Sequence, residues 1–315
     1  MMKRLATAAL AVVLALSLAQ AAVAATYINI ATGPTGGVWY PIGSAMTKVW
    51  GDNIKGMQAS AQSTGGTRNN IQLLESGDAE VCMADGLFYD AYHGLRSYEG
   101  KPQKFLRGAV PIYPEVFHFL VAKGSGIKSL QDLKGKRVAV GAVGGSVSIT
   151  AAQLLKVVGL DMEKDIKAEY LGHADQVSAF SDRRIDASFN VSALGTSSVT
   201  EAATLGMVEL VTLPDEVVAE LCKAVPYFSP FTIPSGVYKG LTEAKTFSSP
   251  NIIAVHEKVA NDLVYQMVKT LYEHKADLVA VVQRMEEMKA EKVPTISIPL
   301  HPGAEKYYRE AGLLK

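Results

Sequence analysis

The sequence predicts an α/β protein that is divided into two lobes with parallel sheets. Short apolar runs alternate with helical patterns along most of the chain, and this alternation is typical of parallel strands joined by helices. Three of the apolar runs end in glycine-rich turns that lead into a helix. After removal of a leader of about 25 residues, the chain of 315 keeps about 290, which is enough for two α/β domains.

The apolar runs and the helical patterns place the expected elements. Strands are expected at Tyr27–Ala31, Met57–Gln62, Glu80–Ala84, Phe117–Ala122, Arg137–Val140, Ile166–Leu171, Ile185–Asn190 and Met207–Leu213. Helices are expected at Tyr40–Trp50, Arg68–Glu75, Leu87–His93, Ser129–Leu133, Val147–Val158 and Asp175–Phe180, and the chain is strongly helical from Asn261 to Lys289. Ligands of such sheets bind at the carboxyl ends of the strands, where the strand order reverses.

The glycine-rich turns occupy residues 32–40, 63–70 and 141–148. Each turn lies between a strand and a helix, so free backbone N–H groups and the positive end of a helix dipole face the space above it. Such a turn binds anions. In a two-lobed chain, the first two turns come from one lobe and the third faces them from the other. The ligand-binding candidates from these turns are Thr35, Gly36, Gly37, Tyr40, Ser63, Thr64, Gly65, Asn70, Gly144, Gly145, Ser146 and Ser148.

These polar candidates have a second interpretation. The hydroxyl residues could serve only as helix N-caps, because caps and anion sites use the same end of a helix. Asn70 fits a structural position beside its helix as well as a ligand contact. Arg68 fits a solvated surface arginine better than a bidentate partner of a carboxylate.

Further candidates lie at strand ends and on a neighbouring helix. Asp85 ends an apolar strand, where its carboxylate could hold an ammonium group or cap the following helix. Tyr89 could stack on a solute, whereas Trp39 is expected to pack within its lobe. Asn190 and Ser192 end a strand of the second lobe, where contacts with a bound solute are expected.

The first 25 residues are typical of a secretory signal. Lys3 and Arg4 precede the apolar core Leu5–Leu18, and residues 22–24 form an A-x-A site, so cleavage is expected near Ala24 or Ala25. The apolar core is shorter than the ~20 residues of a membrane-spanning helix. The signal therefore predicts export, and a soluble exported protein of this kind fits the periplasm.

Composition and motif content argue against several functional classes. The 31 basic and 31 acidic side chains balance, which disfavours nucleic acid as a partner. The histidines show no metal-ligand spacing, and residues 144–148 miss the G-x-S-x-G pattern by the last glycine. We therefore expect no catalysis, no cofactor and no metal. Cys82 and Cys222 fall in different halves of the chain and are expected to be free thiols.

The sequence resembles the TAXI-type extracytoplasmic solute receptors of tripartite ATP-independent periplasmic (TRAP) transporters. The resemblance runs from about Ile28 to Leu314. Its motifs are Thr32-Gly33 with Gly36–Gly43, Ser63–Thr67 with Asn70, Ala84-Asp85, Gly126–Gly141, Asp186-Ala187 and Ile298–Ala304. The second and the last of these are more distinctive than the Gly126–Gly141 region, which is widespread among periplasmic binding proteins.

The resemblance implies a type II periplasmic binding protein fold, with two α/β lobes, a two-segment hinge and a cleft that closes on the solute. The first lobe is expected to comprise residues 26–115 and 231–315, and the second lobe residues 116–230. The implied partners are a small organic anion and the membrane subunits of a TRAP transporter, and we expect a monomer. Two motifs depart from the family, at Gly144–Ser148 and at Asn190–Leu194.

The sequence thus predicts a receptor for an acidic amino acid such as glutamate, or for a dicarboxylate such as 2-oxoglutarate. Two alternatives remain open at this point. One is a receptor for an ABC importer, and the other is a periplasmic enzyme built on the same two-lobed fold.

Overall fold

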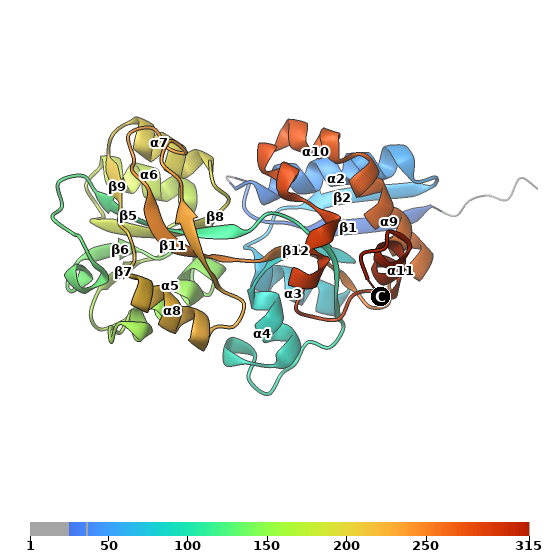
Figure 1. Ribbon diagram of the computed structural model, residues 1–315, viewed down its shortest axis with the longest axis horizontal. Helices are drawn as coiled ribbons and strands as arrows, with labels where there is room; N and C mark the ends of the chain where they lie inside the picture. Colours follow the sequence, from blue (N-terminus) through green and yellow to red (C-terminus); the bar gives the residue numbers. More distant parts are fainter. Residues whose placement is uncertain (1–24, 36, 315) are drawn as a thin grey trace, which may run out of the picture.

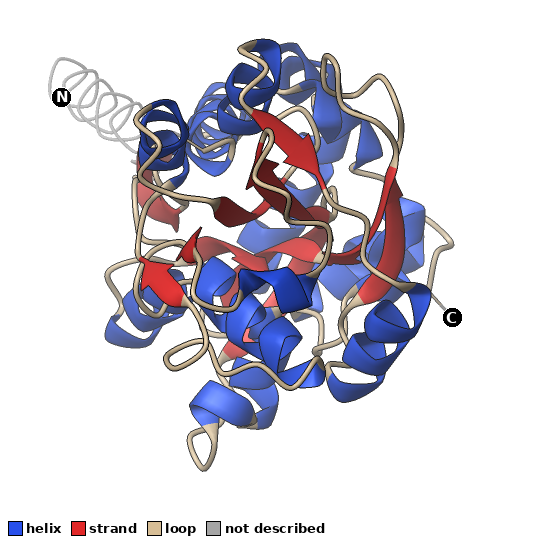
Figure 2. Ribbon diagram, turned by 90° about the vertical axis from the view of Figure 1, so that its left-hand side faces the viewer, coloured by secondary structure: helices blue, strands red, loops and turns tan. Residues whose placement is uncertain are grey.

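A computed structural model describes residues 25–35 and 37–314 of the chain, so the predicted export signal, apart from Ala25, and the candidate Gly36 lie outside the described residues. The described chain forms two lobes, each with its own sheet (Figure 1). Helices surround the strands of both sheets (Figure 2). The described part contains no helix that is long and apolar enough to cross a membrane.

The first lobe contains a five-stranded sheet in the order β2-β1-β3-β12-β4. Its three parallel strands alternate with helices, as the sequence predicted, whereas β12 runs antiparallel to both of its neighbours. The strands are β1 (Thr26–Ala31), β2 (Met57–Gln62), β3 (Val81–Asp85), β4 (Leu106–Pro111) and β12 (Asn251–His256). The lobe's helices are α2 (Trp39–Asn53), α3 (Thr67–Ser76), α4 (Leu87–His93), η1 (Arg96–Tyr98), α9 (Asn261–Glu273), α10 (Lys275–Val281), η3 (Gln283–Glu287), η4 (Ala290–Thr295) and α11 (Pro302–Glu310).

The second lobe contains a sheet in the order β10-β11-β5-β8-β6-β7, with β9 paired to β5. This sheet is mixed. β6 pairs in parallel with β7 and β8, whereas β5 runs antiparallel to β8, β9 and β11. The strands are β5 (Glu115–Ala122), β6 (Arg137–Ala139), β7 (Lys167–Glu169), β8 (Ala187–Ser192), β9 (Val208–Leu210), β10 (Ser229–Ile233) and β11 (Ala244–Ser249). The helices are η2 (Leu130–Leu133), α5 (Ser146–Val157), α6 (His173–Ser181), α7 (Ser197–Thr204) and α8 (Asp215–Ala224).

The expected boundary between the lobes at residue 230 differs from the structure. β10 and β11 pair with each other and with β5, so residues 229–249 belong to the second sheet. The chain returns to the first sheet only at Pro250, between β11 and β12. The sequence did not indicate this hairpin, because β10 is short and largely exposed, contains Pro230 and shows no clear strand pattern.

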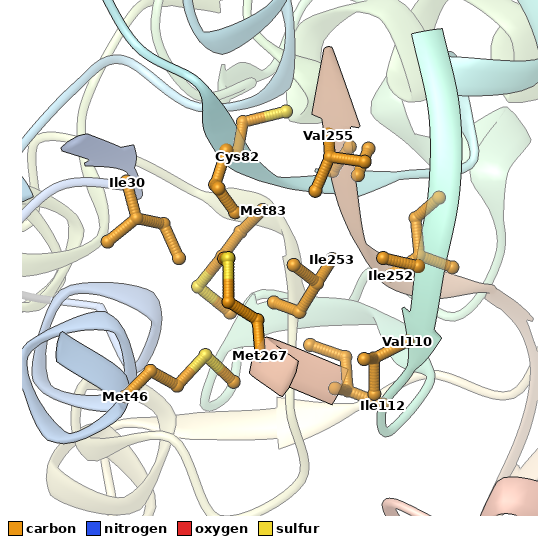
Figure 3. Close-up of a cluster of buried hydrophobic side chains, with 14 of the residues drawn as sticks. Ile30, Met46, Cys82, Met83, Val110, Ile112, Ile252, Ile253, Val255 and Met267 are labelled. Carbon is orange, nitrogen blue, oxygen red and sulfur yellow. The ribbon is translucent and has the colours of Figure 1, made fainter. Parts of the chain in front are cut away.

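Each lobe has its own apolar core. In the first lobe, Met46 and Met267 from α2 and α9 lie against Ile30, Met83 and Ile253 of the sheet (Figure 3). In the second lobe, aromatic rings gather on the central strands, with the Phe117 and Phe247 ring centroids 4.7 Å apart. The described thiols are free, with Cys82 buried in the first core and Cys222 on α8 of the second lobe.

The lobes also contact each other beside the crossing segments. The Ser249 hydroxyl accepts a hydrogen bond of 2.8 Å from the Gly86 backbone N–H at the start of α4. A Cβ atom at Gly86 would lie 2.1 Å from the Tyr227 ring, so this close approach requires glycine. Tyr89 of the first lobe faces the same ring at a centroid distance of 6.2 Å.

Candidate functional site

A cavity of about 280 Å³ lies between the two lobes. Its walls come from the loops that follow β1, β2 and β3 in the first lobe and from the loops that follow β6, β7 and β8 in the second. The lining residues are Pro34, Gly37, Val38, Trp39, Gly65, Gly66, Asp85, Glu115, Gly141, Ala142, Gly145, Ser146, Val147, Gly172, His173, Ala174, Asp175, Val191, Ser192 and Thr196. The cavity therefore occupies the carboxyl ends of the strands, where ligands of α/β sheets bind.

Besides α4, whose start is held by Asp85, and α7, whose N-cap is Thr196, four helices begin at this cavity. α2 and α3 start from the first lobe after Val38 and Gly66, and α5 and α6 start from the second lobe after Gly145 and Gly172. None of these four N-cap residues makes a side-chain cap. The first N–H groups of each helix lack a partner within the helix, and the helix dipole adds positive potential there. The arrangement can therefore hold a negatively charged group from both sides.

Asp85 brings a buried carboxyl group to the same cavity. Its side chain is 5% exposed, and Oδ1 accepts a hydrogen bond of 3.1 Å from the Leu87 backbone N–H. The carboxyl group also interacts with the Ser146 hydroxyl, which reaches it from the opposite lobe. Burial raises the pKa of Asp85 above its ordinary value, because desolvation disfavours the charged form. Asp85 therefore accepts a hydrogen bond from the first residue of α4 and also faces the space between the lobes.

Glu115 is a second buried carboxyl group on the cavity wall. It is 4% exposed, and Oε1 accepts hydrogen bonds of 2.7 Å from Trp39 Nε1 and 3.0 Å from Asn251 Nδ2. Burial raises the pKa of Glu115 to about 8, and the nearby negative charge of Asp85 acts in the same direction. Trp39 therefore does more than pack within its lobe, since its indole lines the cavity and ties α2 to the first residue of β5.

The cavity wall carries no Lys or Arg among the described residues. Arg284, whose charge acts on Glu115 through space, forms an ion pair with Glu287. Arg68 extends across the gap toward the third turn, where its Nη1 would lie 3.4 Å from a Cβ atom at Gly144. The positive potential at the wall of the cavity therefore comes from backbone N–H groups rather than from cationic side chains.

Two polar residues of the second lobe complete the wall. The Ser192 hydroxyl is buried and has no hydrogen-bond partner among the described residues. His173 is the first residue of α6, and burial lowers its pKa to about 4, so the ring is neutral at pH 7. Both groups can exchange hydrogen bonds with a solute without adding charge.

The structure brings six of the predicted site residues to the cavity wall. These are Gly37, Gly65, Asp85, Gly145, Ser146 and Ser192. They come from both lobes and include residues of all three predicted turns.

Three predicted residues of the second turn hold the turn instead of facing the cavity. Asn70 is fully buried, and its amide donates to the carbonyl oxygens of Thr32 at 2.6 Å and Met83 at 2.7 Å. The Thr64 hydroxyl contacts Asn70 Oδ1 and accepts from the Gly66 N–H. The Ser63 hydroxyl donates to the Gly33 carbonyl oxygen at 3.0 Å. Asn70 is therefore a structural residue, as its second interpretation proposed.

The remaining described candidates lie outside the cavity wall. The Ser148 hydroxyl donates to the Gly145 carbonyl oxygen at 2.9 Å, and Tyr89 packs on His93 with ring centroids 4.4 Å apart. Asn190 is buried behind the wall, in a small space that it shares with His173. Thr35, Tyr40 and Gly144 belong to the turns but are not part of the lining.

Comparison with known proteins places the chain in a family. The model of the NMT1-like family matches residues 30–312. The chain belongs to the NMT1-like family.

Solved structures agree with the two-lobed fold of this NMT1-like chain. A periplasmic transporter matches with a TM-score of 0.54 and 15% identity, over 91% of this chain and 92% of its own. A protein from Xanthomonas citri, solved bound to ATP, has a TM-score of 0.53 and 12% identity over 92% and 97%. A protein from Bordetella bronchiseptica RB50 has a TM-score of 0.53 and 15% identity over 91% and 98%. The NMT1-like chain thus has the type II periplasmic binding protein fold.

Sequence reasoning missed Glu115 and the fourth turn of this NMT1-like cavity. Glu115 is the first residue of a strongly apolar strand at the first crossing, and an isolated acid in that position was the available signal. The fourth turn contains a single glycine, Gly172, between an expected strand and an expected helix. With one glycine, this strand-turn-helix unit is less conspicuous in the sequence than the three glycine-rich turns.

Proposed function

We propose that this NMT1-like protein is a periplasmic solute receptor that closes on a small organic anion and delivers it to a TRAP transporter. The observation that carries the proposal is the group of uncapped helix N-termini from both lobes, among them α2, α3, α5 and α6, that face one cavity. A carboxylate in that position would receive backbone N–H groups from both sides, so its binding would favour the closed form.

The candidate solutes are an acidic amino acid such as glutamate and a dicarboxylate such as 2-oxoglutarate. The cavity volume of about 280 Å³ suits a molecule of this size. Several of the predicted contacts, namely Gly37, Gly65, Gly145 and Ser146, belong to the cavity wall. These contacts are mostly backbone N–H groups, which recognise a carboxylate but do not select the rest of the solute.

Thermal-shift measurements with carboxylates, amino acids and neutral sugars test the binding proposal. The receptor is expected to be stabilised by carboxylate-bearing compounds, by an amount that grows with ligand excess over the dissociation constant. Stabilisation by neutral sugars alone would contradict it.

The delivery step needs a separate test, because an ABC importer is the second candidate partner. Reconstituted membrane subunits with the bound receptor should take up solute when an ion gradient is imposed and ATP is absent. Uptake that depends on ATP alone would assign the receptor to an ABC importer. Chemical conversion of the solute by the purified protein would instead favour an enzyme.

A further inference from the structure

Two buried acidic side chains face the cavity, and among the described residues of its wall no cationic side chain balances them. Asp85 and Glu115 are 5% and 4% exposed, and both belong to the lining. Burying a carboxylate without a positive partner is costly. The neutral donors Trp39 and Asn251 satisfy one oxygen of Glu115, but they supply no charge.

The sheet register brings these two acids together at the second crossing. Asn251 pairs with Asp85 in the β12–β3 ladder, while Ser249 pairs with Glu115 in the β11–β5 ladder. Only Pro250 separates Ser249 from Asn251, and the Asn251 amide contacts Glu115 directly. The two carboxyl groups therefore lie on either side of one short segment and open into the same space.

We propose that Asp85 and Glu115 form an ammonium subsite, so that the receptor selects a zwitterionic amino acid over the oxo acid of the same carbon skeleton. The inference rests on the proposed function, which supplies the carboxylate end of the solute. The carboxylate lies at the helix N-termini and the ammonium group lies between the two acids.

A third group points to a polar solute at this place. The Ser192 hydroxyl is 5% exposed, lines the cavity and lacks a partner among the described residues. A buried hydroxyl without a partner is costly, and an amine or carboxylate in the cavity would satisfy it. A solute with both charged ends therefore complements the helix N-termini, the two acids and this hydroxyl together.

The subsite also couples binding of the amino acid to the release of a proton from Glu115. With its pKa at about 8, Glu115 is largely protonated at pH 7 in the empty cavity. The charged and titratable groups that act on it are Asp85, Tyr113 and Arg284. An ammonium group beside Glu115 favours the carboxylate form, so the carboxyl proton leaves to the buffer as the amine binds. The ammonium group itself keeps its proton.

Calorimetry on matched pairs tests the subsite, using protein freed of bound solute by unfolding and refolding. The probes are each standard amino acid, its 2-oxo acid where one exists, and putrescine, which carries amines without a carboxylate. Wild-type protein should bind its preferred amino acid at least roughly tenfold more tightly than the matching oxo acid. In Glu115→Gln, which keeps an oxygen acceptor for Trp39 and Asn251, this preference should shrink by roughly tenfold because the charge is gone.

Two further variants and a second readout separate a subsite from a merely structural role. Asp85→Asn should lose the same preference, while Glu209→Gln, an exposed acid on β9, should change nothing. Titration at pH 7 in buffers of different ionisation enthalpy should show release of close to one proton by wild type and none by Glu115→Gln. At pH 9.5 the release should be lost, because Glu115 is already ionised, and net proton uptake should appear instead, because the partly deprotonated amine of the free amino acid binds as ammonium.

The outcomes distinguish this inference from the proposed function. Equal or tighter binding of oxo acids by wild type, or an equal loss for both members of a pair in Glu115→Gln, would overturn the ammonium subsite and leave a carboxylate receptor. Absence of binding by every amino acid and oxo acid, with or without binding of putrescine, would overturn both.

Discussion

At the scale of single residues, Asn70 illustrates a side chain that supports the turns of the site without lining the cavity. The side-chain amide of Asn70, in the first turn of α3, donates to the carbonyl oxygens of Thr32, directly after β1, and of Met83, in the middle of β3. Its family position alone could not decide this role, because an asparagine near a turn serves ligands and backbone equally well. Burial and the two short hydrogen bonds decide it.

Asn70→Leu should therefore destabilise the empty protein. The variant leaves the buried Met83 carbonyl oxygen without its donor and removes one of two side-chain donors from the Thr32 carbonyl oxygen, which keeps the Thr64 hydroxyl, so it is expected to cost about 1–3 kcal/mol of unfolding free energy. Urea denaturation without solute measures the effect. The neighbouring Asn69→Leu, which loses one exposed bond to the Gly65 N–H, is the control and should cost much less. Equal stability of Asn70→Leu and wild type would show that the carbonyl oxygens find other partners.

At the scale of elements, the third turn shows which glycines are required by the backbone and which by the solute. Gly141 has φ of +79°, and a Cβ there would lie 2.6 Å from Val147 Cβ. Gly145 has an ordinary φ of −77° and faces the cavity, so the backbone itself does not demand glycine at that position. The two glycines therefore have different roles within one turn.

Gly145→Val should weaken solute binding far more than stability. Its side chain occupies cavity space, while its Cβ meets only the Ala142 carbonyl oxygen at 3.2 Å. Gly141→Val should instead lower the unfolding temperature of the empty protein, because positive φ and the Val147 contact both oppose it. Calorimetry and thermal unfolding on both variants check this. A Gly145→Val variant that binds as tightly as wild type would remove the third turn from the site.

The sequence predicted these elements unevenly, and the reason is physical. β1, β2 and β3 are parallel and joined by helices, so the alternation of strand and helix patterns and the glycine turns located them closely. The antiparallel hairpin β10–β11 lacks both signals, and the lobe boundary was misplaced with it. The positions of Gly37, Gly65 and Gly145 at the cavity wall could be predicted, because each belongs to a glycine-rich turn between a strand and a helix. The sequence placed Glu115 beside an apolar strand but could not show that it faces the cavity, because its partners Trp39 and Asn251 are distant in sequence.

At the scale of the whole molecule, two buried groups give stability opposite dependences on pH. His118 is fully buried on β5, with its ring nitrogens 3.0 Å from the Val116 carbonyl oxygen and 2.8 Å from the Tyr238 hydroxyl. Burial lowers the pKa of His118 to about 4 and raises the pKa of Glu115 to about 8. The folded protein therefore resists protonation of one group and ionisation of the other.

The unfolding free energy of the empty protein should reflect both groups. The contribution of His118 is complete above its ordinary pKa of 6.5 and is lost as the pH falls toward about 4. The contribution of Glu115 is complete below its ordinary pKa of 4.5 and is lost as the pH rises through about 8. Between pH 6.5 and 8, the decline due to Glu115 should be absent from Glu115→Gln. An unchanged slope in that variant would show that Glu115 ionises freely in the fold.

The central claim is that a solute is held between the lobes, and native mass spectrometry of the protein purified from its native cells without refolding tests it most directly. Wild-type protein should carry one molecule of a carboxylate-bearing solute per chain, and identification by fragmentation should reveal an amine as well. Gly145→Val, purified in the same way, should carry none. A wild-type protein without any bound solute after such purification, or equal occupancy of the variant, would contradict the account.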